Sequence, residues 1–389
     1  MKFLLLIVLS SACGADLKEA LQPEEDPISL GKRYISDPDF RRETLLKSVV
    51  DPWNGYSRLR IENYGPGLAW ESIPVWNPQI RPLRRESTQA FTSFPDIDFE
   101  TITESELKAF GKLAFERFPL VSDLQIRAFV NAPSEIGLWE TETIGGLVEV
   151  DLASGIQVAK TCSTCHASAP ESALIYGRAN ADFDFGRVIG ARWGHGTMDV
   201  TPDGQANPTS VPDIRPIRFQ KYLHWSATLK NSLPALAIRI ETLFITSFSQ
   251  RLRPPREVVF ALAYFFWTLH ETEQRKSVLD SQSSNGAEIF EKHCSSCHFS
   301  NGETAPPMDL DVIGTSKEVG LSSSRGTGKY RIPSLFSVSS RGHFFHDGSL
   351  GKLADVLDPQ RLEQTPGHRF GLDLSTTEKS DLLTFLDTL

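Results

Sequence analysis

The pentapeptide Cys162-Ser-Thr-Cys165-His166 recurs as Cys294-Ser-Ser-Cys297-His298, and the two copies contain four of the five cysteines in the chain. In a C-x-x-C-H sequence the two thiols add to the vinyl groups of a haem as thioethers, and the adjacent histidine reaches the iron as its proximal ligand. The repeat therefore predicts two covalently bound haem c groups. His166 and His298 are the predicted proximal ligands of the two irons.

Zinc is the alternative metal for such cysteine pairs, because two C-x-x-C sequences also build zinc ribbons. Ribbon pairs usually lie about 15–20 residues apart, whereas Cys162 and Cys294 are 132 positions apart. A site of four thiolates also has no use for the two adjacent histidines. Haem attachment is therefore the favoured interpretation.

The N-terminus has the features of an export signal. Met1-Lys2 precede an apolar run over residues 3–9, which is too short to cross a bilayer because a spanning helix needs about 20 apolar residues. Small residues then lead to Cys13 in a sequence that resembles a bacterial lipobox, with Ser10 where the lipobox usually has Leu. We expect residues 1–13 to bring the chain to the periplasmic side. It would be lipid-anchored there through Cys13, or soluble in the periplasm after simple cleavage.

Length and charge narrow the function classes. With 389 residues, 40% of them hydrophobic, the chain can form two or three domains with real cores. Its net charge is −9 and it contains no basic block, which argues against nucleic-acid binding. The acidic balance suits a basic electron-donor protein as partner.

Apolar periodicity and turn residues give a coarse order of elements. Residues 14–100 are rich in Pro, Trp and Arg, and we predict an extension of loops and short strands. A capping box at residues 103–106 predicts a helix over 104–118. Alternation and turns predict a hairpin over 145–155, which leads into the first attachment sequence. The almost wholly apolar stretch 258–269 predicts a buried helix, and residues 271–285 a linker.

Two further helices are predicted around the second attachment sequence. Asn285 can cap a helix that runs into Cys294, and Ser375 begins a last helix with an apolar stripe. A first and a last helix that cross over a haem form the core of the class I cytochrome c fold. We therefore expect a mainly α-helical protein with two class I cytochrome c-like haem domains, at residues 101–275 and 284–389.

The chain past the second attachment sequence carries a family signature. Tyr330-Arg-Ile-Pro-Ser-Leu335 is followed by Gly342-His-Phe-Phe-His346-Asp347-Gly348-Ser349-Leu350. Together they resemble the C-terminal signature of the bacterial di-haem cytochrome c peroxidase superfamily, which includes the di-haem enzymes of methylamine utilisation. Phe336-Ser337 replaces the Arg-Asn pair of that signature. Gly194-His195-Gly196, Asn207-Pro208-Thr209 and His224-Trp225 follow the order of the family's first-half motifs.

The tail shows a second resemblance within the same superfamily. Pro366-Gly367-His368-Arg369-Phe370-Gly371 is similar to a segment of the latex-cleaving rubber oxygenases. This similarity implies that His368 is the sixth ligand of the second haem, with Met308 as the alternative. The peroxidase resemblance implies that His195 is the distal ligand of the first haem, with His224 as the alternative. Asn207 matches a calcium ligand of the peroxidases, so calcium is a possible further cofactor.

Three residues are candidates for catalysis. His346 beside Asp347 could donate or shuttle a proton near a haem. Trp225 matches the family's tryptophan between the two haems, where it could assist electron transfer. Glu241 lies in the neighbourhood of the family's catalytic glutamate, although its distance from Trp225 differs, and Ala235 stands where the family has a glutamine.

These features together predict an exported di-haem oxidoreductase in which electrons pass between two covalent haems. The favoured reaction is the reduction of hydrogen peroxide, with electrons from a small redox protein of the cytochrome c or cupredoxin type. Two alternatives remain. One is an electron-transfer cytochrome with both irons six-coordinate, and the other is a di-haem oxygenase that acts on an organic substrate.

Overall fold

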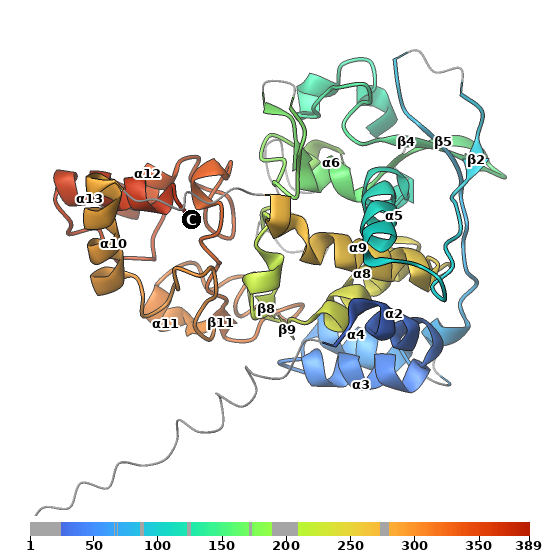
Figure 1. The fold of residues 1–389 in the computed structure, drawn as a ribbon, viewed down its shortest axis with the longest axis horizontal. Helices are drawn as coiled ribbons and strands as arrows, with labels where there is room; N and C mark the ends of the chain where they lie inside the picture. The colour runs from blue at the N-terminus through green and yellow to red at the C-terminus, as the bar shows by residue number, and fades with distance from the viewer. Residues whose placement is uncertain are drawn as a thin grey trace, which may run out of the picture.

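The chain is mainly α-helical, as predicted (Figure 1). The computed structural model describes residues 25–65, 67, 69–85, 89–122, 126–170, 173–188, 209–272 and 280–389. The predicted export signal and Cys13 lie outside these residues. The second half of the chain, orange to red in Figure 1, lies beside the rest of the molecule. No described helix is both long and apolar enough to cross a membrane.

The N-terminal extension begins with three helices, which corrects the prediction of loops and short strands. They are α2 (Pro27–Ser36), α3 (Pro38–Ser48) and α4 (Gly55–Asn63). The side chains of Asp26, Asp37 and Asn54 cap them, and α2 and α3 begin with proline. Proline at the first position of a helix costs nothing, because that N–H has no helical partner. The predicted short strands follow at β1 (Gln79–Pro82) and β2 (Thr92–Ser93).

The extension shares one hydrophobic core with the first haem-attachment half. Tyr34, Leu45 and Trp70 are buried in the same apolar cluster as the residues of α8 (Leu233–Ser247) and α9 (Arg256–Trp267). Helix α9 is the predicted buried helix, and it is apolar on every side because α2, α5 and α8 surround it. Residues 25–100 are therefore a structural part of the first half.

The predicted helix after Thr103 is confirmed as α5 (Glu104–Arg117), with the predicted capping box in place. It crosses α9 at Gly111. A Cβ atom added there would lie 2.1 Å from the backbone oxygen of Ala261, so the two backbones are in direct contact. Glycine is required at this crossing because any side chain would force the helices apart.

A small antiparallel sheet leads to the first attachment sequence. Its strands are ordered β2-β1-β4-β5-β3, where β4 (Val148–Leu152) and β5 (Gly155–Lys160) form the predicted hairpin and β3 is Val121–Ser122. Strand β5 runs directly into the short helix α6 (Cys162–His166). The sheet thereby fixes where the first pair of thiols begins.

The second half is built on two crossing helices, α10 (Ser281–His293) and α13 (Thr376–Leu386). They cross at Gly286, where an added Cβ atom would lie 2.1 Å from the backbone oxygen of Asp381. Helix α13 has the predicted Ser375 cap. The predicted start of α10 is wrong, since Asp280 caps this helix and Asn285 lies inside it. Residues 281–285, which were predicted as part of a linker, therefore belong to α10, and Gly286 allows the close crossing.

Short elements complete both halves. They are η1 (Ala69–Ser72), η2 (Ile126–Phe129), η3 (Pro133–Ile136), β6 (Ala167–Ser168), β7 (Ile175–Tyr176), α7 (Phe185–Val188), η5 (Ile217–Phe219), β8 (Tyr222–Leu223), β9 (Leu229–Lys230), η6 (Leu269–Thr272), β10 (Met308–Asp309), α11 (Leu310–Ile313), β11 (Lys329–Tyr330), η7 (Val338–Ser340), α12 (Leu353–Val356) and η8 (Pro359–Glu363).

Candidate haem sites

The first attachment sequence forms helix α6, directly after β5. Thr161 precedes it, and its hydroxyl donates to the backbone oxygen of Gly146 at 2.8 Å, which fixes the turn. Cys162 and Cys165 lie on this helix. Burial, followed by the neighbouring thiol, raises the pKa of Cys162 to about 12, so the thiol is neutral.

Both predicted proximal histidines have the same backbone partner. Nδ1 of His166 lies 3.1 Å from the carbonyl oxygen of Pro212, and Nδ1 of His298 lies 3.0 Å from that of Pro333. Since a carbonyl oxygen can only accept, Nδ1 carries the proton in both rings. Nε2 then keeps its lone pair, and such a hydrogen bond on the far nitrogen is the usual support of a metal-bound histidine. Both rings are oriented and protonated as haem ligands would be.

Burial keeps both rings neutral. It is the main cause that lowers the pKa of His166 to about 4 and that of His298 to about 3. In the second ring the charge of His368 adds to this effect. Neutral imidazole is the form that binds metals, so the electrostatics agree with the hydrogen bonds.

A cavity lies next to the second attachment sequence. Its volume is about 210 Å³, it is partly open to solvent, and its wall is mostly apolar. An apolar wall with a few polar groups is typical of a pocket for a small molecule or cofactor. Cys294, Cys297 and His298 line it, together with His368 and Met308.

The geometry of His298 and His368 fits one iron between them. Their ring centroids are 6.4 Å apart. A metal–imidazole bond of about 2.0–2.1 Å, with the nitrogen roughly 1.1 Å from the ring centre, gives roughly 6.3 Å for two rings on opposite sides of one metal. This distance favours His368 over Met308 as the sixth ligand.

Arg361 holds the loop that presents His368. Its guanidinium donates to the carbonyl oxygens of Val356, Thr365 and Gly367 at 2.9 Å each, and to that of His368 at 2.6 Å. The backbone of His368 is in the left-handed region, with φ of 44°. Four hydrogen bonds from one buried side chain therefore stabilise an otherwise unfavourable conformation.

His346 and Trp225 line the same cavity. His346 is 8% exposed, and burial is the main cause that lowers its pKa. Asp347 accepts from the N–H of Ser349, which holds the turn. Trp225 comes from the first half, and its Nε1 donates to the backbone oxygen of Ser210 at 3.2 Å. The structure thus places both side chains at the cavity beside the second attachment sequence.

His224, the alternative ligand of the first iron, has one ring nitrogen in a hydrogen bond. Nε of Arg239 donates to its Nε2 at 2.6 Å. The ring also packs edge-on against Tyr56, with centroids 4.8 Å apart. Burial, then the charge of Arg239, lowers the pKa of His224 well below its usual value. The hydrogen bond from Arg239 argues against iron binding through Nε2, while Nδ1 is buried without a hydrogen-bond partner.

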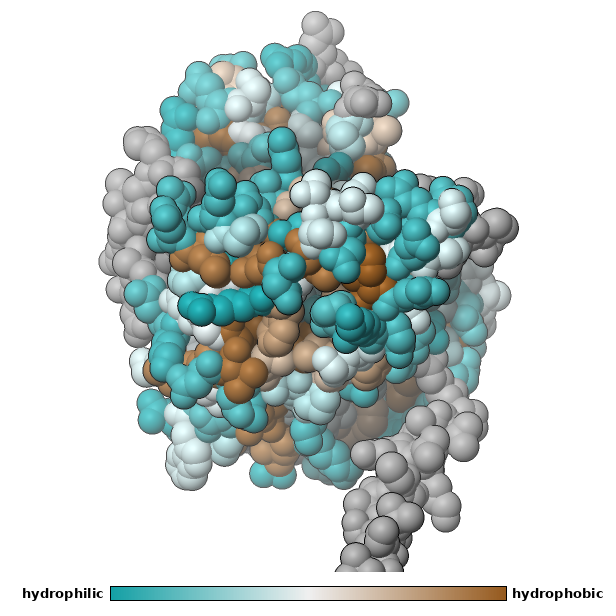
Figure 2. Space-filling view, turned by 90° about the vertical axis from the view of Figure 1, so that its left-hand side faces the viewer, coloured by the Kyte–Doolittle hydropathy of each residue, from teal (hydrophilic) through white to brown (hydrophobic). Residues whose placement is uncertain are grey.

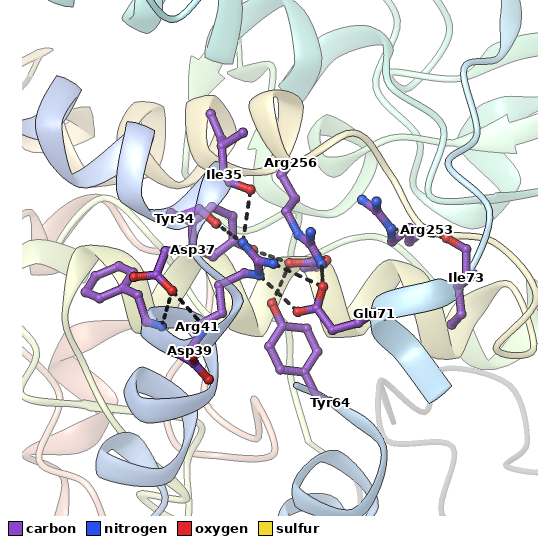
Figure 3. Close-up of polar contacts among 12 residues, drawn as sticks. Tyr34, Ile35, Asp37, Asp39, Arg41, Tyr64, Glu71, Ile73, Arg253 and Arg256 are labelled. Atoms are coloured by element: carbon purple, nitrogen blue, oxygen red, sulfur yellow. Dashed lines mark hydrogen bonds and ion pairs between the residues drawn. The ribbon is translucent and has the colours of Figure 1, made fainter. Parts of the chain in front are cut away.

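Glu241 lies in a buried polar network and does not line the cavity. Figure 3 shows the residues Tyr34, Tyr64 and Arg256 of this network together with Arg41 and Glu71. Its carboxylate accepts from the hydroxyls of Tyr34 and Tyr64, the latter at 2.9 Å, and from Nε of Arg256 at 3.2 Å. Arg256 also forms an ion pair with Glu71, which in turn pairs with Arg41. This network joins α2, α3 and α8 to α9. These contacts argue against a catalytic role for Glu241, since both its oxygens take part in the packing of these helices.

Two predicted ligands cannot be placed. His195 and Asn207 lie outside the described residues. Within the described part of the chain, no group of three or more His, Cys, Asp or Glu side chains could hold a metal ion. Calcium therefore stays a prediction that depends on Asn207.

The sequence analysis did not predict that proline carbonyls accept hydrogen bonds from the two histidines, although these prolines belong to an internal repeat. Val211-Pro212-Asp213-Ile214 corresponds to Ile332-Pro333-Ser334-Leu335, 121 positions later. The same offset relates the paired residues Leu223 and Leu229 to Phe344 and Leu350. Each half thus repeats one unit, in which a proline carbonyl supports the histidine and a tight turn follows.

Comparisons with known proteins find only distant similarity in structure. No protein-family model and no curated protein sequence matches the chain. It is similar in structure to a MauG-like protein associated with microbial copper homeostasis, with 17% identity, a TM-score of 0.42, and 82% of this chain and 94% of that chain covered. It is also similar to the diheme peroxidase BthA from Burkholderia thailandensis E264, with 14% identity, a TM-score of 0.35 and the same coverage. At such low identity, the function has to be inferred from the residues of the candidate sites.

Proposed function

We propose that this chain is an exported di-haem c-type oxidoreductase with two class I cytochrome c-like haem domains. One observation carries the proposal, the 6.4 Å separation of His298 and His368 across the cavity beside the second pair of cysteines. Bound haem supplies one-electron chemistry at each attachment site. The two half-structures, each with two helices that cross at a glycine, support the domain assignment.

The second site is proposed as the electron-transfer site. A His298–His368 pair would leave no open coordination position for a substrate. Two histidines also set a lower potential than a histidine and a methionine. Trp225 reaches this cavity from the first half, so it lies where a π-system could connect the two sites.

The first site is proposed as the place where hydrogen peroxide is reduced. The reaction breaks the O–O bond, consumes two electrons and two protons, and yields two waters. The electrons would come from a small cytochrome c or cupredoxin, and the resemblance assigns His195 as the ligand that departs. On the side of the molecule formed by the second half, apolar surface lies between polar side chains, which suits a docking partner (Figure 2).

A pure electron-transfer cytochrome is the competing function, and the position of Glu241 favours it. Peroxide cleavage needs a base and a polar group that stabilises the separating charge. Glu241 cannot serve, because Tyr34, Tyr64 and Arg256 occupy its oxygens. A peroxidase would need other groups for this purpose.

Spectroscopy of the mature protein separates the two functions. We expect mass spectrometry to find two added haems, and electron paramagnetic resonance to show one bis-histidine low-spin signal. The half-reduced protein should show a second, high-spin haem that responds to peroxide. If every state contains only low-spin haem that ignores peroxide, the chain is an electron carrier and the peroxidase proposal fails.

Export and lipid attachment are tested separately. We expect the full chain to fractionate with bacterial membranes and the Cys13→Ser variant to appear in the soluble periplasmic fraction. Equal distribution of both proteins would remove the lipid anchor and leave the haem proposal intact.

A further inference from the structure

Three arginines near the two proposed haem sites have no carboxylate partner in the described part of the chain. Arg60 belongs to α4, Arg239 to α8, and Arg331 follows β11. Arg60 is 5% exposed and Arg331 is 7% exposed. Among the described residues none of the three forms an ion pair, and Arg60 and Arg239 are bonded only to Thr242, to the Tyr56 carbonyl and to His224. The described residues therefore leave this positive charge without a compensating negative charge.

The ring of Tyr56 is the centre of this arginine cluster. The guanidinium carbon of Arg60 lies 3.4 Å from its centroid, that of Arg325 5.6 Å and that of Arg239 5.8 Å. Arg331 stacks on Trp225, the residue after His224, at 4.6 Å. Like charges this close repel each other strongly where water is excluded. An aromatic face offsets only part of that repulsion, at about 0.5–2 kcal/mol per contact.

Several donors in the cluster are buried without a partner. They are Nε and Nη1 of Arg331 and the hydroxyl of Tyr56, a residue that is 7% exposed. A buried donor without an acceptor costs about 1–3 kcal/mol, and an unpaired buried charge costs more. The cluster therefore needs an anion that offers several oxygen acceptors.

We propose that the arginine cluster is a carboxylate-binding site filled by haem propionates, with Arg331 receiving a propionate of the second haem. This inference rests on the proposed function. Arg331 lines the second cavity. Trp225, on which it stacks, donates to Ser210, two residues before the carbonyl that supports His166. The cluster thus adjoins both sites, and the planar fork of a guanidinium matches a carboxylate.

The N-terminal extension closes this site. The N–H groups of Gly55 and Tyr56 donate to the backbone oxygens of Ser323 and Ser324, at 2.8 Å and 2.7 Å. The side chain of Asn54 donates to Gly326. These bonds fix the start of α4 against the second half, beside Arg325. The extension therefore covers the cluster and supplies it with Tyr56 and Arg60.

Redox titration of the two-haem protein tests the proposal. Loss of a positive charge beside a haem favours the oxidised iron, so Arg331→Met should lower the midpoint potential of the bis-histidine haem. Arg331→Lys should restore most of the shift, because the charge returns. Arg60→Met removes a charge from the same cluster and should lower a midpoint potential also. It serves as the second test if Arg331→Met does not fold.

Arg41→Met is the matched control. Arg41 is as deeply buried, at 2% exposed, but it is paired with Glu71 at 3.0 Å and does not line the cavity. We expect this variant to melt at a lower temperature with both midpoint potentials unchanged. Unchanged potentials in Arg331→Met and Arg60→Met, with two haems attached by mass, would overturn the proposal.

A titration with formate distinguishes the source of the carboxylate. Formate replaces chloride at constant ionic strength, and the potentials of the wild-type protein should stay constant because the propionates already fill the site. A saturable shift would mean that a solution anion occupies the cluster, which also overturns the proposal. A mass without haem would instead remove the proposed function itself.

Discussion

The two halves support the proximal histidine in the same way but differ on the other side of the ring. In each half a proline carbonyl accepts from Nδ1, and a tight turn follows. The turn has positive φ at His224 and Ala227 in the first half, and at Phe345 and Gly348 in the second. The second half then adds a loop that brings His368 opposite His298. In the first half the chain continues into α8, and His224 is bonded to Arg239.

The support of the proximal histidine is common to the two halves, whereas the residues on the opposite side of the ring are specific to each half. Proximal support uses backbone atoms and a turn, so it survives sequence divergence. The sixth ligand depends on one side chain from a separate loop, so it differs between the halves. A fixed ligand suits electron transfer at the second site, while the described residues place no histidine opposite His166. The contrast predicts unequal responses to matched substitutions.

The largest effect is expected at His368. His368→Gly should convert the second haem from low-spin to high-spin, because the variant removes the ring that faces His298. Visible and electron paramagnetic resonance spectra measure this change, and added imidazole should reverse it. Met308→Leu is the matched control and should leave the spectra unchanged. A low-spin signal that persists in His368→Gly would assign the ligand to another residue.

The Glu241 network has no equivalent in the second half, so damage to it should affect only the first. Glu241→Gln removes the charge that pairs with Arg256 and leaves that guanidinium with Glu71 alone. Breaking a buried pair typically costs about 3–5 kcal/mol, and the retained hydrogen bonds should keep the loss at about 3. Thermal unfolding measures it. Any peroxide turnover should change less than twofold, and a complete loss would restore Glu241 as a catalytic residue.

Several elements were predictable because their signals are local. Thr103 and Ser375 both begin helices with capping boxes, and both helices are where the sequence predicts them. Helices α2 and α3 were not predicted because the sequences Asp26-Pro27 and Asp37-Pro38 are also typical of turns. Only tertiary packing against α8 and α9 selects the helix there.

The partners of the site residues were less predictable, because they are distant in sequence. Glu241 meets Tyr34, which is 207 positions away, and the side chain of Asn54 reaches Gly326 across 272 positions. No pattern within a short stretch of sequence predicts contacts between residues so far apart. The prediction that His368 is a ligand relied on a family motif, and the structure places this residue in the wall of the second cavity. The hydrogen bond between His224 and Arg239 could not be predicted from the sequence, since it depends on how α8 packs beside the turn.

The glycine crossings should show a smaller effect of similar size in the two halves. In Gly111→Ala and Gly286→Ala the new methyl group meets a backbone oxygen at 2.1 Å, so the helices must separate. Overpacking of this kind costs about 1–3 kcal/mol, partly offset by about 1 kcal/mol of helix propensity. Melting temperatures measure the loss. Gly351→Ala, where an added Cβ has nothing within 4 Å, is the neutral control. A loss in only one half would mean that the two crossings are not equivalent.

The smallest effect is expected at His224. The contrast between the two halves depends on this residue not binding the first iron. If the Arg239 bond holds this ring, His224→Gln should leave the spectra of both haems unchanged in the oxidised and half-reduced states. Glutamine keeps an acceptor for Nε of Arg239 and fills much of the same volume beside Tyr56. His368→Gln is the matched variant in the second half and should change the spin state. A new high-spin signal in His224→Gln would show that the ring leaves Arg239 to bind the first iron, and that each half supplies its own sixth ligand.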